Sequence, residues 1–181
     1  MTSGPAKPNI ALIGFMGTGK STVGRLIAAQ LGFRFVDTDE LIEERTGRPI
    51  AQIFQDAGEP VFRDLERQLL AEISGWTRTV IATGGGMVAQ PGTLDELKRS
   101  ALTVCLWASP DTIWERVRHQ NHRPLLQTDD PEAKIRELLA QREPFYRQAD
   151  LLIRSDQRAA RQVAQQIIHH FREAHSAPST P

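Results

Sequence analysis

Short runs of apolar residues alternate along the chain with longer stretches in which apolar residues recur every three or four positions. The runs have the length of buried strands, and the stretches have the spacing of helices that pack one face on a core. The predicted strands are Ile10–Ile13, Phe33–Val36, Thr79–Ala82, Ala101–Trp107 and Leu151–Ile153. The predicted helices are Thr22–Leu31, Leu41–Arg45, Ile50–Ala57, Glu59–Ser74, Leu94–Arg99, Asp111–His119, Pro131–Tyr146 and Ala159–Ala174.

This alternation predicts a three-layer α/β/α fold, in which helices cover both faces of a five-stranded parallel sheet. The polar, proline-containing ends predict disordered tails at residues 1–8 and 176–181, so that a single domain spans residues 9–175. Ligands of such sheets bind where the carboxyl ends of the strands meet, near a change in strand order. We therefore expect the chemistry to lie in the segments that follow each strand.

Composition narrows the choice of partners. The chain has 181 residues with 22 basic and 22 acidic side chains, so it has no overall field to hold nucleic acid or an anionic membrane. No stretch approaches the ~20 apolar residues of a membrane-spanning helix, and the N-terminus lacks the apolar core of a signal peptide. The only cysteine, Cys105, cannot form an internal disulfide, which fits a reducing cytoplasm.

The first predicted strand is followed by a phosphate-binding motif. Gly14-Phe-Met-Gly-Thr-Gly19-Lys20-Ser21 fits G-x-x-x-x-G-K-[ST] and leads into a predicted helix. In such a loop the backbone N–H groups and the helix N-terminus hold phosphate oxygens. Lys20 is expected to contact the β- and γ-phosphates, and the Ser21 hydroxyl to bind Mg²⁺. The motif indicates a nucleoside triphosphate but leaves the reaction open.

Acidic residues follow the second predicted strand. Asp37 and Asp39 are two residues apart, and such residues share one face of a strand. We therefore expect both carboxylates to project beside the phosphate loop, one toward Mg²⁺ and the other toward a substrate hydroxyl. The alternative is that the pair only caps the next helix.

Two further motifs suggest an acceptor site. Arg63 and Glu66 lie three residues apart on a predicted helix, where they either form an exposed ion pair or leave Arg63 to bind a substrate carboxylate. The triple glycine Gly84–Gly86 follows the third strand and either presents N–H groups to a ligand or forms a flexible loop. Arg142, near the end of a later helix, would by itself be interpreted as a surface residue.

A basic stretch without acids lies between two predicted helices. Residues 116–123 hold three arginines, and Pro124-Leu-Leu126 follows them. We expect this segment to be a lid that closes over phosphates, with Arg123 neutralising charge on the transferred phosphoryl group. The alternative is a solvated basic surface. The five histidines show no spacing typical of metal ligands and are interpreted as surface residues.

Taken together and in this order, the motifs resemble those of the shikimate kinase family. They are Ile13-Gly-Phe-Met-Gly-Thr-Gly-Lys-Ser, Phe35-Val-Asp-Thr-Asp, Gly58-Glu-Pro-Val-Phe-Arg-Asp-Leu-Glu, Ile81-Ala-Thr-Gly-Gly-Gly, Arg123-Pro-Leu-Leu and Arg142-Glu-Pro-Phe-Tyr. The resemblance spans about residues 10–171. It implies a P-loop NTPase of the nucleoside-monophosphate-kinase type, with a lid at about residues 118–130. It also implies a monomer that phosphorylates the 3-hydroxyl of shikimate with ATP and Mg²⁺, in chorismate and aromatic amino acid biosynthesis.

The resemblance also assigns roles to individual residues. Lys20, Asp39 and Arg123 would be catalytic, with Asp39 holding shikimate hydroxyls and acting as the base, and Ser21 and Asp37 would lie at the metal. The implied nucleotide-binding residues are Gly17, Thr18, Gly19, Lys20, Ser21, Thr22, Arg116, Arg123 and Arg158. Among them, Arg116 would stack on adenine. The implied shikimate-binding residues are Asp39, Arg63, Gly84, Gly85, Gly86 and Arg142.

Two classes of alternative stay open. Another small-molecule kinase of the same fold would phosphorylate gluconate or a nucleoside monophosphate, although Phe-Arg-x-x-Glu and the triple glycine favour shikimate. A non-catalytic nucleotide-binding module is the second class. Its guanine-specific form would need Asn-Lys-x-Asp, and neither Asn9 nor Asn121 precedes a lysine. The presence of Lys20, Ser21, Asp39 and Arg123 disfavours an inactive binder.

Overall fold

Five short parallel strands form one sheet in the order β2-β3-β1-β4-β5. The computed structural model describes residues 7–119 and 124–176. The strands are β1 (Asn9–Ile13), β2 (Arg34–Asp37), β3 (Thr79–Ala82), β4 (Ala101–Trp107) and β5 (Leu151–Arg154). The predicted parallel sheet is confirmed, and each predicted strand lies within one residue of the observed one. The strand order changes direction around β1, so ligands are expected at the carboxyl end of that strand.

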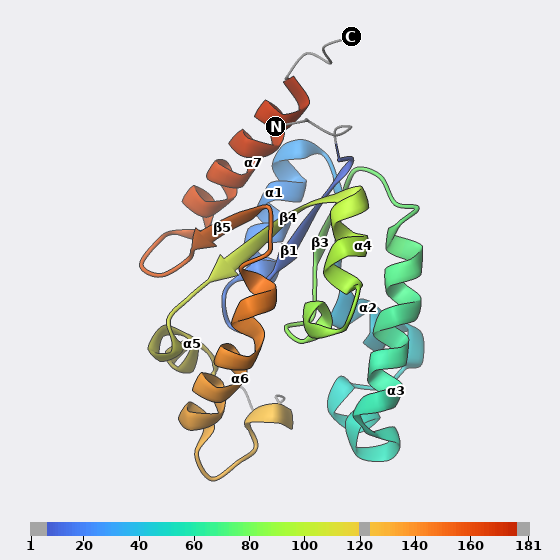
Figure 1. The fold of residues 1–181 in the computed structure, drawn as a ribbon, viewed down its shortest axis with the longest axis vertical. Helices are drawn as coiled ribbons and strands as arrows, with labels where there is room; N and C mark the ends of the chain where they lie inside the picture. The colour runs from blue at the N-terminus through green and yellow to red at the C-terminus, as the bar shows by residue number, and fades with distance from the viewer. Residues whose placement is uncertain (1–6, 120–123, 177–181) are drawn as a thin grey trace.

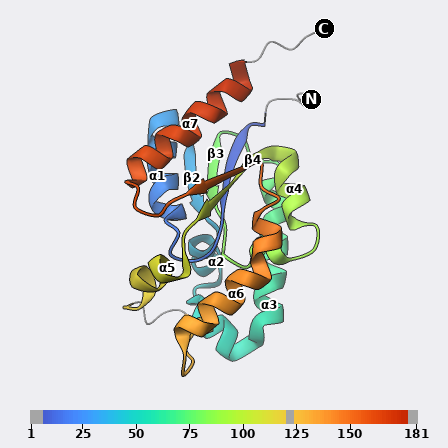
Figure 2. The ribbon, with the colours of Figure 1, turned by 60° about the vertical axis from the view of Figure 1, so that its left-hand side comes forward.

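Helices cover both faces of the sheet (Figures 1 and 2). The helices are α1 (Lys20–Leu31), α2 (Thr38–Thr46), α3 (Ile50–Ile73), α4 (Thr93–Ser100), α5 (Pro110–Val117), α6 (Pro131–Tyr146) and α7 (Ala160–Ser176), with short 3₁₀ turns at η1 (Met87–Ala89) and η2 (Pro124–Leu126). Helices α1 and α7 pack on one face, and α3, α4 and α6 pack on the other. The predicted three-layer α/β/α architecture is therefore confirmed.

The central strand β1 shows why the sheet needs both layers of helices. All five of its residues are buried. Ile10 and Leu12 belong to the apolar cluster with α1 and α7, whereas Ala11 and Ile13 belong to the cluster with α3, α4 and α6. Successive side chains of a strand point to opposite faces, so an uninterrupted apolar run is what a doubly covered parallel strand requires.

The helical segment between β2 and β3 differs from the prediction. Residues predicted as two helices on either side of Gly58 form the single segment α3, which is kinked at Gly58. Gly58 has φ 81° and ψ 168°. This conformation lies outside the helical region, and glycine adopts it readily. Pro60 follows, and a proline is tolerated in a first helical turn because its missing N–H has no partner there. The kink therefore falls at the boundary that the sequence predicted.

The chain ends are partly included in the fold. Lys7 donates to Asp150 Oδ2 at 2.8 Å, and Pro8 accepts a hydrogen bond from the Arg78 N–H at 3.1 Å. Ser176 is the last residue of α7. Residues 1–6 and 177–181 of the predicted tails lie outside the described residues. Within the described ranges, no helix has the length and apolarity needed to cross a bilayer.

Asp150 joins three parts of the chain at the end of the sheet opposite the strands' carboxyl ends. In addition to Lys7, its Oδ2 accepts from the backbone N–H and the hydroxyl of Thr103, each at 2.9 Å. Burial alone would raise the pKa of the Asp150 carboxyl, but the hydrogen bonds from Lys7 and Thr103 outweigh burial and lower it. The folded state thus binds the ionised form of Asp150 more favourably than the unfolded chain does.

We therefore predict that Asp150 makes stability dependent on acid pH. A lowered pKa stabilises the fold above the unfolded value of about 3.9, and this stabilisation is lost as the pH falls through the folded pKa. Asp150→Asn should lower the free energy of unfolding by roughly 1–2 kcal/mol at pH 7, and by less below pH 4. Urea titrations from pH 7 to pH 3 measure the loss of unfolding free energy at each pH. Asp111→Asn, in an exposed ion pair with Arg136, is the control. An equal effect of the two substitutions at pH 7 would contradict the prediction.

Candidate active site

A cleft of about 620 Å³ opens at the carboxyl ends of the strands. It brings together fifteen of the residues that the sequence singled out, on seven different segments. They are Gly17, Thr18, Gly19, Lys20, Ser21, Thr22, Asp37, Asp39, Arg63, Gly84, Gly85, Gly86, Arg116, Arg142 and Arg158. Arg123, which was predicted to contact phosphates, lies outside the described residues.

The phosphate loop connects β1 to α1 as predicted. Gly14 has φ 133°, and a Cβ on it would lie 2.3 Å from the carbonyl oxygen of Leu106, so a side chain is excluded at this position. Lys20 Nζ donates to the carbonyl oxygens of Gly14 at 2.9 Å and Phe15 at 2.8 Å, which holds the ammonium group across the loop. Thr18 is buried and donates to the same Phe15 oxygen at 2.8 Å. The loop thus presents a cation and the N-terminus of α1 to an anion.

Asp37 is the last residue of β2 and caps α2. Its Oδ1 accepts from the backbone N–H of Asp39 at 3.0 Å, and its Oδ2 accepts from the Ser21 hydroxyl at 2.6 Å. The expectation that Asp37 and Asp39 share a strand face was wrong, because α2 begins at Thr38 and places Asp39 in its first turn. Capping by Asp37, the alternative, is what the geometry shows. Both carboxylates nevertheless line the cleft.

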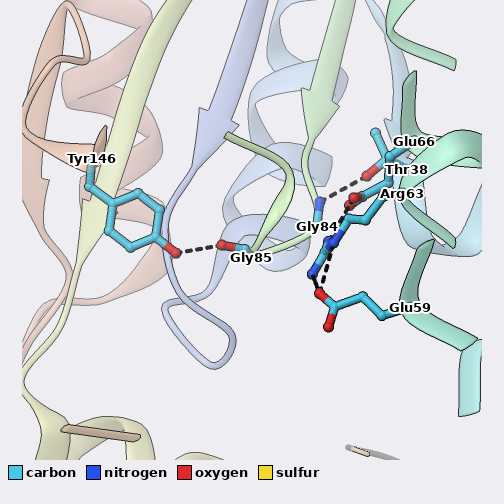
Figure 3. A network of polar contacts seen from close by, with 7 residues as sticks. All are labelled: Thr38, Glu59, Arg63, Glu66, Gly84, Gly85 and Tyr146. Carbon is cyan, nitrogen blue, oxygen red and sulfur yellow. Dashed lines mark hydrogen bonds and ion pairs between the residues drawn. The ribbon is translucent and has the colours of Figure 1, made fainter. Parts of the chain in front are cut away.

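Gly84 lies where the loop after β3 meets α2 and α3 (Figure 3). Its N–H donates to the buried Thr38 hydroxyl at 2.8 Å. A Cβ on Gly84 would lie 2.6 Å from Asp39 Oδ1 and 3.0 Å from Glu66 Oε1, so both carboxyl groups press against this glycine. The expectation that the Gly84 N–H points freely at a ligand was therefore wrong. Gly84 instead provides the space in which two acids approach each other.

Arg63 projects from α3 between two glutamates (Figure 3). Its Nη1 donates to Glu66 Oε2 at 2.7 Å, and its Nε and Nη2 donate to Glu59 Oε1 at 3.0 and 2.6 Å. The pair with Glu66 was considered as an exposed ion pair, but Glu66 is 1% exposed and Arg63 is 12% exposed. The interaction is therefore a buried one, and the guanidinium is held rigidly at the wall of the cleft.

Burial sets the electrostatics of this wall. The pKa of Glu66 is raised because burial disfavours its charge and Asp39 adds repulsion, although Arg63 opposes both effects. Burial alone would lower the pKa of Arg63, but Glu66 and Glu59 outweigh it and raise the value. Gly86 packs against the same guanidinium, since a Cβ there would lie 2.9 Å from Arg63 Nη2.

Arg142 lines the cleft from α6, and the fully buried Tyr146 of the same helix supports it from behind. Arg142 is 8% exposed, and its guanidinium lies 5.4 Å from the centroid of the Phe15 ring, so its interpretation as a surface residue was wrong. Tyr146 donates its hydroxyl to the carbonyl oxygen of Gly85 at 2.5 Å (Figure 3). Burial raises the pKa of the Tyr146 phenol, so it remains a donor. The sequence singled out Tyr146 only as the last residue of the motif Arg142-Glu-Pro-Phe-Tyr and assigned it no role.

Arg116 and Arg158 mark the opposite end of the cleft. Arg116 donates to the carbonyl oxygens of Gly17 and Ser155, each at 3.0 Å, and thus bridges the phosphate loop and the segment after β5. Arg158 follows the same segment and donates to Gln166 at 2.8 Å. Both side chains line the cleft.

Residues 7–119 and 124–176 contain no group of three or more His, Cys, Asp or Glu side chains that could hold a metal ion. Cys105 is fully buried, and burial raises the pKa of its thiol to about 12, so it is an unreactive core residue.

Comparisons with known proteins point to one family. The sequence model of the family described as shikimate kinase matches residues 16–172. A shikimate kinase of Thermodesulfovibrio yellowstonii is 47% identical over 163 residues, which are 90% of this chain and 94% of the relative. The solved structure of a shikimate kinase from Acinetobacter baumannii in complex with shikimate has a TM-score of 0.90 and 40% identity, covering 95% of this chain and 96% of the other. A gluconokinase from Sinorhizobium meliloti has a TM-score of 0.59 at 17% identity, over 92% and 93% of the chains, which shows a shared fold alone.

We predict that the hydrogen bond from the Gly84 N–H to the Thr38 hydroxyl stabilises the folded protein. Thr38→Val leaves the buried N–H of Gly84 without its acceptor and should lower the free energy of unfolding by about 1–3 kcal/mol. Thr38→Ser keeps the hydroxyl and should recover most of the loss. Denaturant titration of the three chains measures the difference. Equal stability of the valine and serine variants would show that the hydrogen bond contributes nothing.

Proposed function

The chain belongs to the shikimate kinase family, and from that premise we propose which of its residues carry the reaction. The enzyme transfers the γ-phosphoryl group of ATP to the 3-hydroxyl of shikimate and uses Mg²⁺, a step of aromatic amino acid biosynthesis. The observation that supports the assignment of roles is the composition of one cleft. A phosphate loop lies at one end of it, and the buried Arg142 and the partly buried Arg63 lie with a carboxylate at the other.

The nucleotide half is assigned to the phosphate loop and the arginines beyond it. Residues 17–22 would hold the phosphates, and Lys20 would leave the loop carbonyls to contact the β- and γ-phosphates. Arg116 and Arg158 would contact the adenosine portion. Ser21 and Asp37 fit a magnesium site because their side-chain oxygens already lie 2.6 Å apart at the edge of the loop, and oxygen is the ligand that Mg²⁺ prefers. When bound there, the ion neutralises charge that develops on the transferred group.

The acceptor half is assigned to Arg63, Arg142 and Asp39. A planar guanidinium binds a carboxylate through paired N–H groups, so Arg63 and Arg142 suit the carboxylate of shikimate. Asp39 lines the cleft next to Gly84 and suits the ring hydroxyls. Gly85 and Gly86 would leave space for the ring against the backbone. This set needs a small acceptor that carries both a carboxylate and several hydroxyls.

The chain's own contribution to the reaction is position and charge. Phosphoryl transfer requires an acceptor oxygen in line with the γ-phosphate, and rigid side chains supply that alignment. The guanidinium groups would fix the ring through its carboxylate, and the Asp39 carboxylate would accept the proton of the 3-hydroxyl as the oxygen attacks. Lys20 and Arg123 would stabilise the charge that spreads over the phosphoryl oxygens.

We also propose a lid, a cellular location and an oligomeric state. The lid at about residues 118–130 is supported by Leu125, which lines the cleft, and by the basic composition of the segment before it. We propose a cytoplasmic monomer whose partner is the small-molecule substrate rather than nucleic acid or a membrane. The support is the unpaired, buried Cys105 and the balance of 22 basic and 22 acidic residues.

We predict that Arg63 serves the acceptor and not the nucleotide. Arg63→Ala removes a charged pair with the substrate carboxylate, worth about 2–3 kcal/mol, and should raise the KM for shikimate roughly 30- to 150-fold. The KM for ATP should be unchanged. Arg67→Ala is the matched control, because Arg67 lies one turn further along α3, is 65% exposed and pairs with Asp64 of the same helix. An unchanged KM for shikimate in Arg63→Ala would refute the assignment of the clamp.

The assignment as a whole is tested by comparing acceptors. An assay of ADP release should show turnover with shikimate, and little with gluconate or nucleoside monophosphates at equal concentration. Gluconate carries a carboxylate but not the rigid ring, so it controls for the carboxylate clamp alone. Lys20→Ala should abolish turnover of every acceptor while the unfolding midpoint stays near that of the unchanged chain. A preference for another acceptor would overturn the proposed roles of the acceptor half.

A further inference from the structure

The guanidinium of Arg63 is already engaged by two carboxylates of its own helix. Glu66 takes one N–H of Nη1, and a single oxygen of Glu59 accepts from both Nε and Nη2 (Figure 3). The Nε–Nη2 side is one of the edges through which a guanidinium binds a carboxylate with two parallel hydrogen bonds. Glu59 therefore occupies an edge of Arg63 that a substrate carboxylate would use.

The two glutamates differ in how easily each can give up its hydrogen bonds to Arg63. Glu66 is 1% exposed, so removing its carboxylate from Arg63 would leave a charge buried without its main partner. Glu59 is 53% exposed and lies just after the kink at Gly58, where its carboxylate can rotate into water at little cost. Of the two, Glu59 is the partner that Arg63 can exchange.

The charges around the cleft favour such an exchange. The charge of Glu66 interacts with the charges of Arg63, Asp39 and Arg142, so these acids and arginines are close enough to affect one another electrostatically. With Glu59 included, three carboxylates face two guanidinium groups. A carboxylate on the substrate would be a fourth, and the repulsion falls if one of the resident carboxylates moves into solvent as the substrate binds.

We propose that Glu59 is an internal competitor of the substrate carboxylate at Arg63. It occupies the Nε–Nη2 edge while the acceptor subsite is empty, keeps the guanidinium oriented, and leaves when the substrate carboxylate arrives. Its return assists release of the product, whose phosphate adds further negative charge. This inference rests on the proposed function, in which Arg63 binds the carboxylate of shikimate.

The test is the isosteric substitution Glu59→Gln, which keeps an acceptor for Arg63 but removes the charge. Exposed ion pairs are weak, so removing this one should lower the KM and the Kd for shikimate about two- to fivefold, with kcat and the KM for ATP unchanged. The uncharged carboxamide of shikimate should show no such gain. Titration calorimetry gives the Kd, and the ADP-release assay gives the kinetic constants.

Glu143→Gln is the matched control on α6. Glu143 Oε1 accepts from both Nε and Nη2 of Arg147 at 2.7 and 2.5 Å, with the same spacing of four residues, and the Arg147 guanidinium lies outside the acceptor subsite. This variant should bind shikimate like the unchanged chain. A gain equal to that of Glu59→Gln would overturn the proposal, and so would an equal gain for the carboxamide.

Two other results for Glu59→Gln would overturn the proposal. A higher or unchanged KM for shikimate in Glu59→Gln would show that Glu59 positions Arg63 or does nothing, and would overturn the competition. Glu59→Ala, which also removes the acceptor, should again lower the KM, whereas a purely positioning role predicts a rise. If the unchanged chain did not phosphorylate shikimate, the proposed function itself would fail. Turnover in the unchanged chain without a gain in Glu59→Gln overturns only the inference about Glu59.

Discussion

The acceptor half of the cleft depends on how closely the loop after β3 approaches α2 and α3 at Gly84. The N–H of this residue is held by Thr38, and its missing side chain leaves the space into which Asp39 and Glu66 both point. Any Cβ would push these acids apart, because it would lie 2.6 Å from one and 3.0 Å from the other. The position of the carboxylate that would serve as the base and the position of the glutamate that holds Arg63 are thus set by one backbone contact.

Balanced charge is the second consequence of this packing. A guanidinium at the wall of a cleft keeps one orientation only when buried acceptors hold it, and Glu66 does so for Arg63 at 2.7 Å. The buried acid in turn relies on Arg63, since burial raises the pKa of Glu66 and the cation opposes that rise. The zero net charge of the chain therefore conceals a site built from opposite charges in contact. Recognition of an anionic substrate comes from placement of these charges and not from an overall field.

The sequence predicted the fold well because burial and local pattern decide it. A doubly covered strand such as β1 must be apolar throughout, and the phosphate loop carries its own spacing of glycines and lysine. Side-chain roles set by contacts between distant segments were harder to predict. Arg142 is buried because α6 packs against the phosphate loop at Phe15, and Thr38 holds Gly84 across 46 residues of sequence. Neither contact leaves a periodic signal. The prediction that Asp37 and Asp39 share a strand face was wrong for a local reason, since Asp37 caps α2 and so ends β2.

Transfer between two substrates requires that their subsites keep a fixed separation, and the glycine loop links them physically. The carbonyl oxygen of Gly85 accepts from Tyr146 on α6, the helix that also carries Arg142. On its other side, Gly85 packs on the phosphate loop, because a Cβ there would lie 3.3 Å from the Met16 nitrogen. One glycine thus contacts the nucleotide half and is hydrogen-bonded to the acceptor half. Because misplacement of about 1 Å can cost orders of magnitude in rate, such direct packing between the two halves is what the in-line geometry of phosphoryl transfer demands.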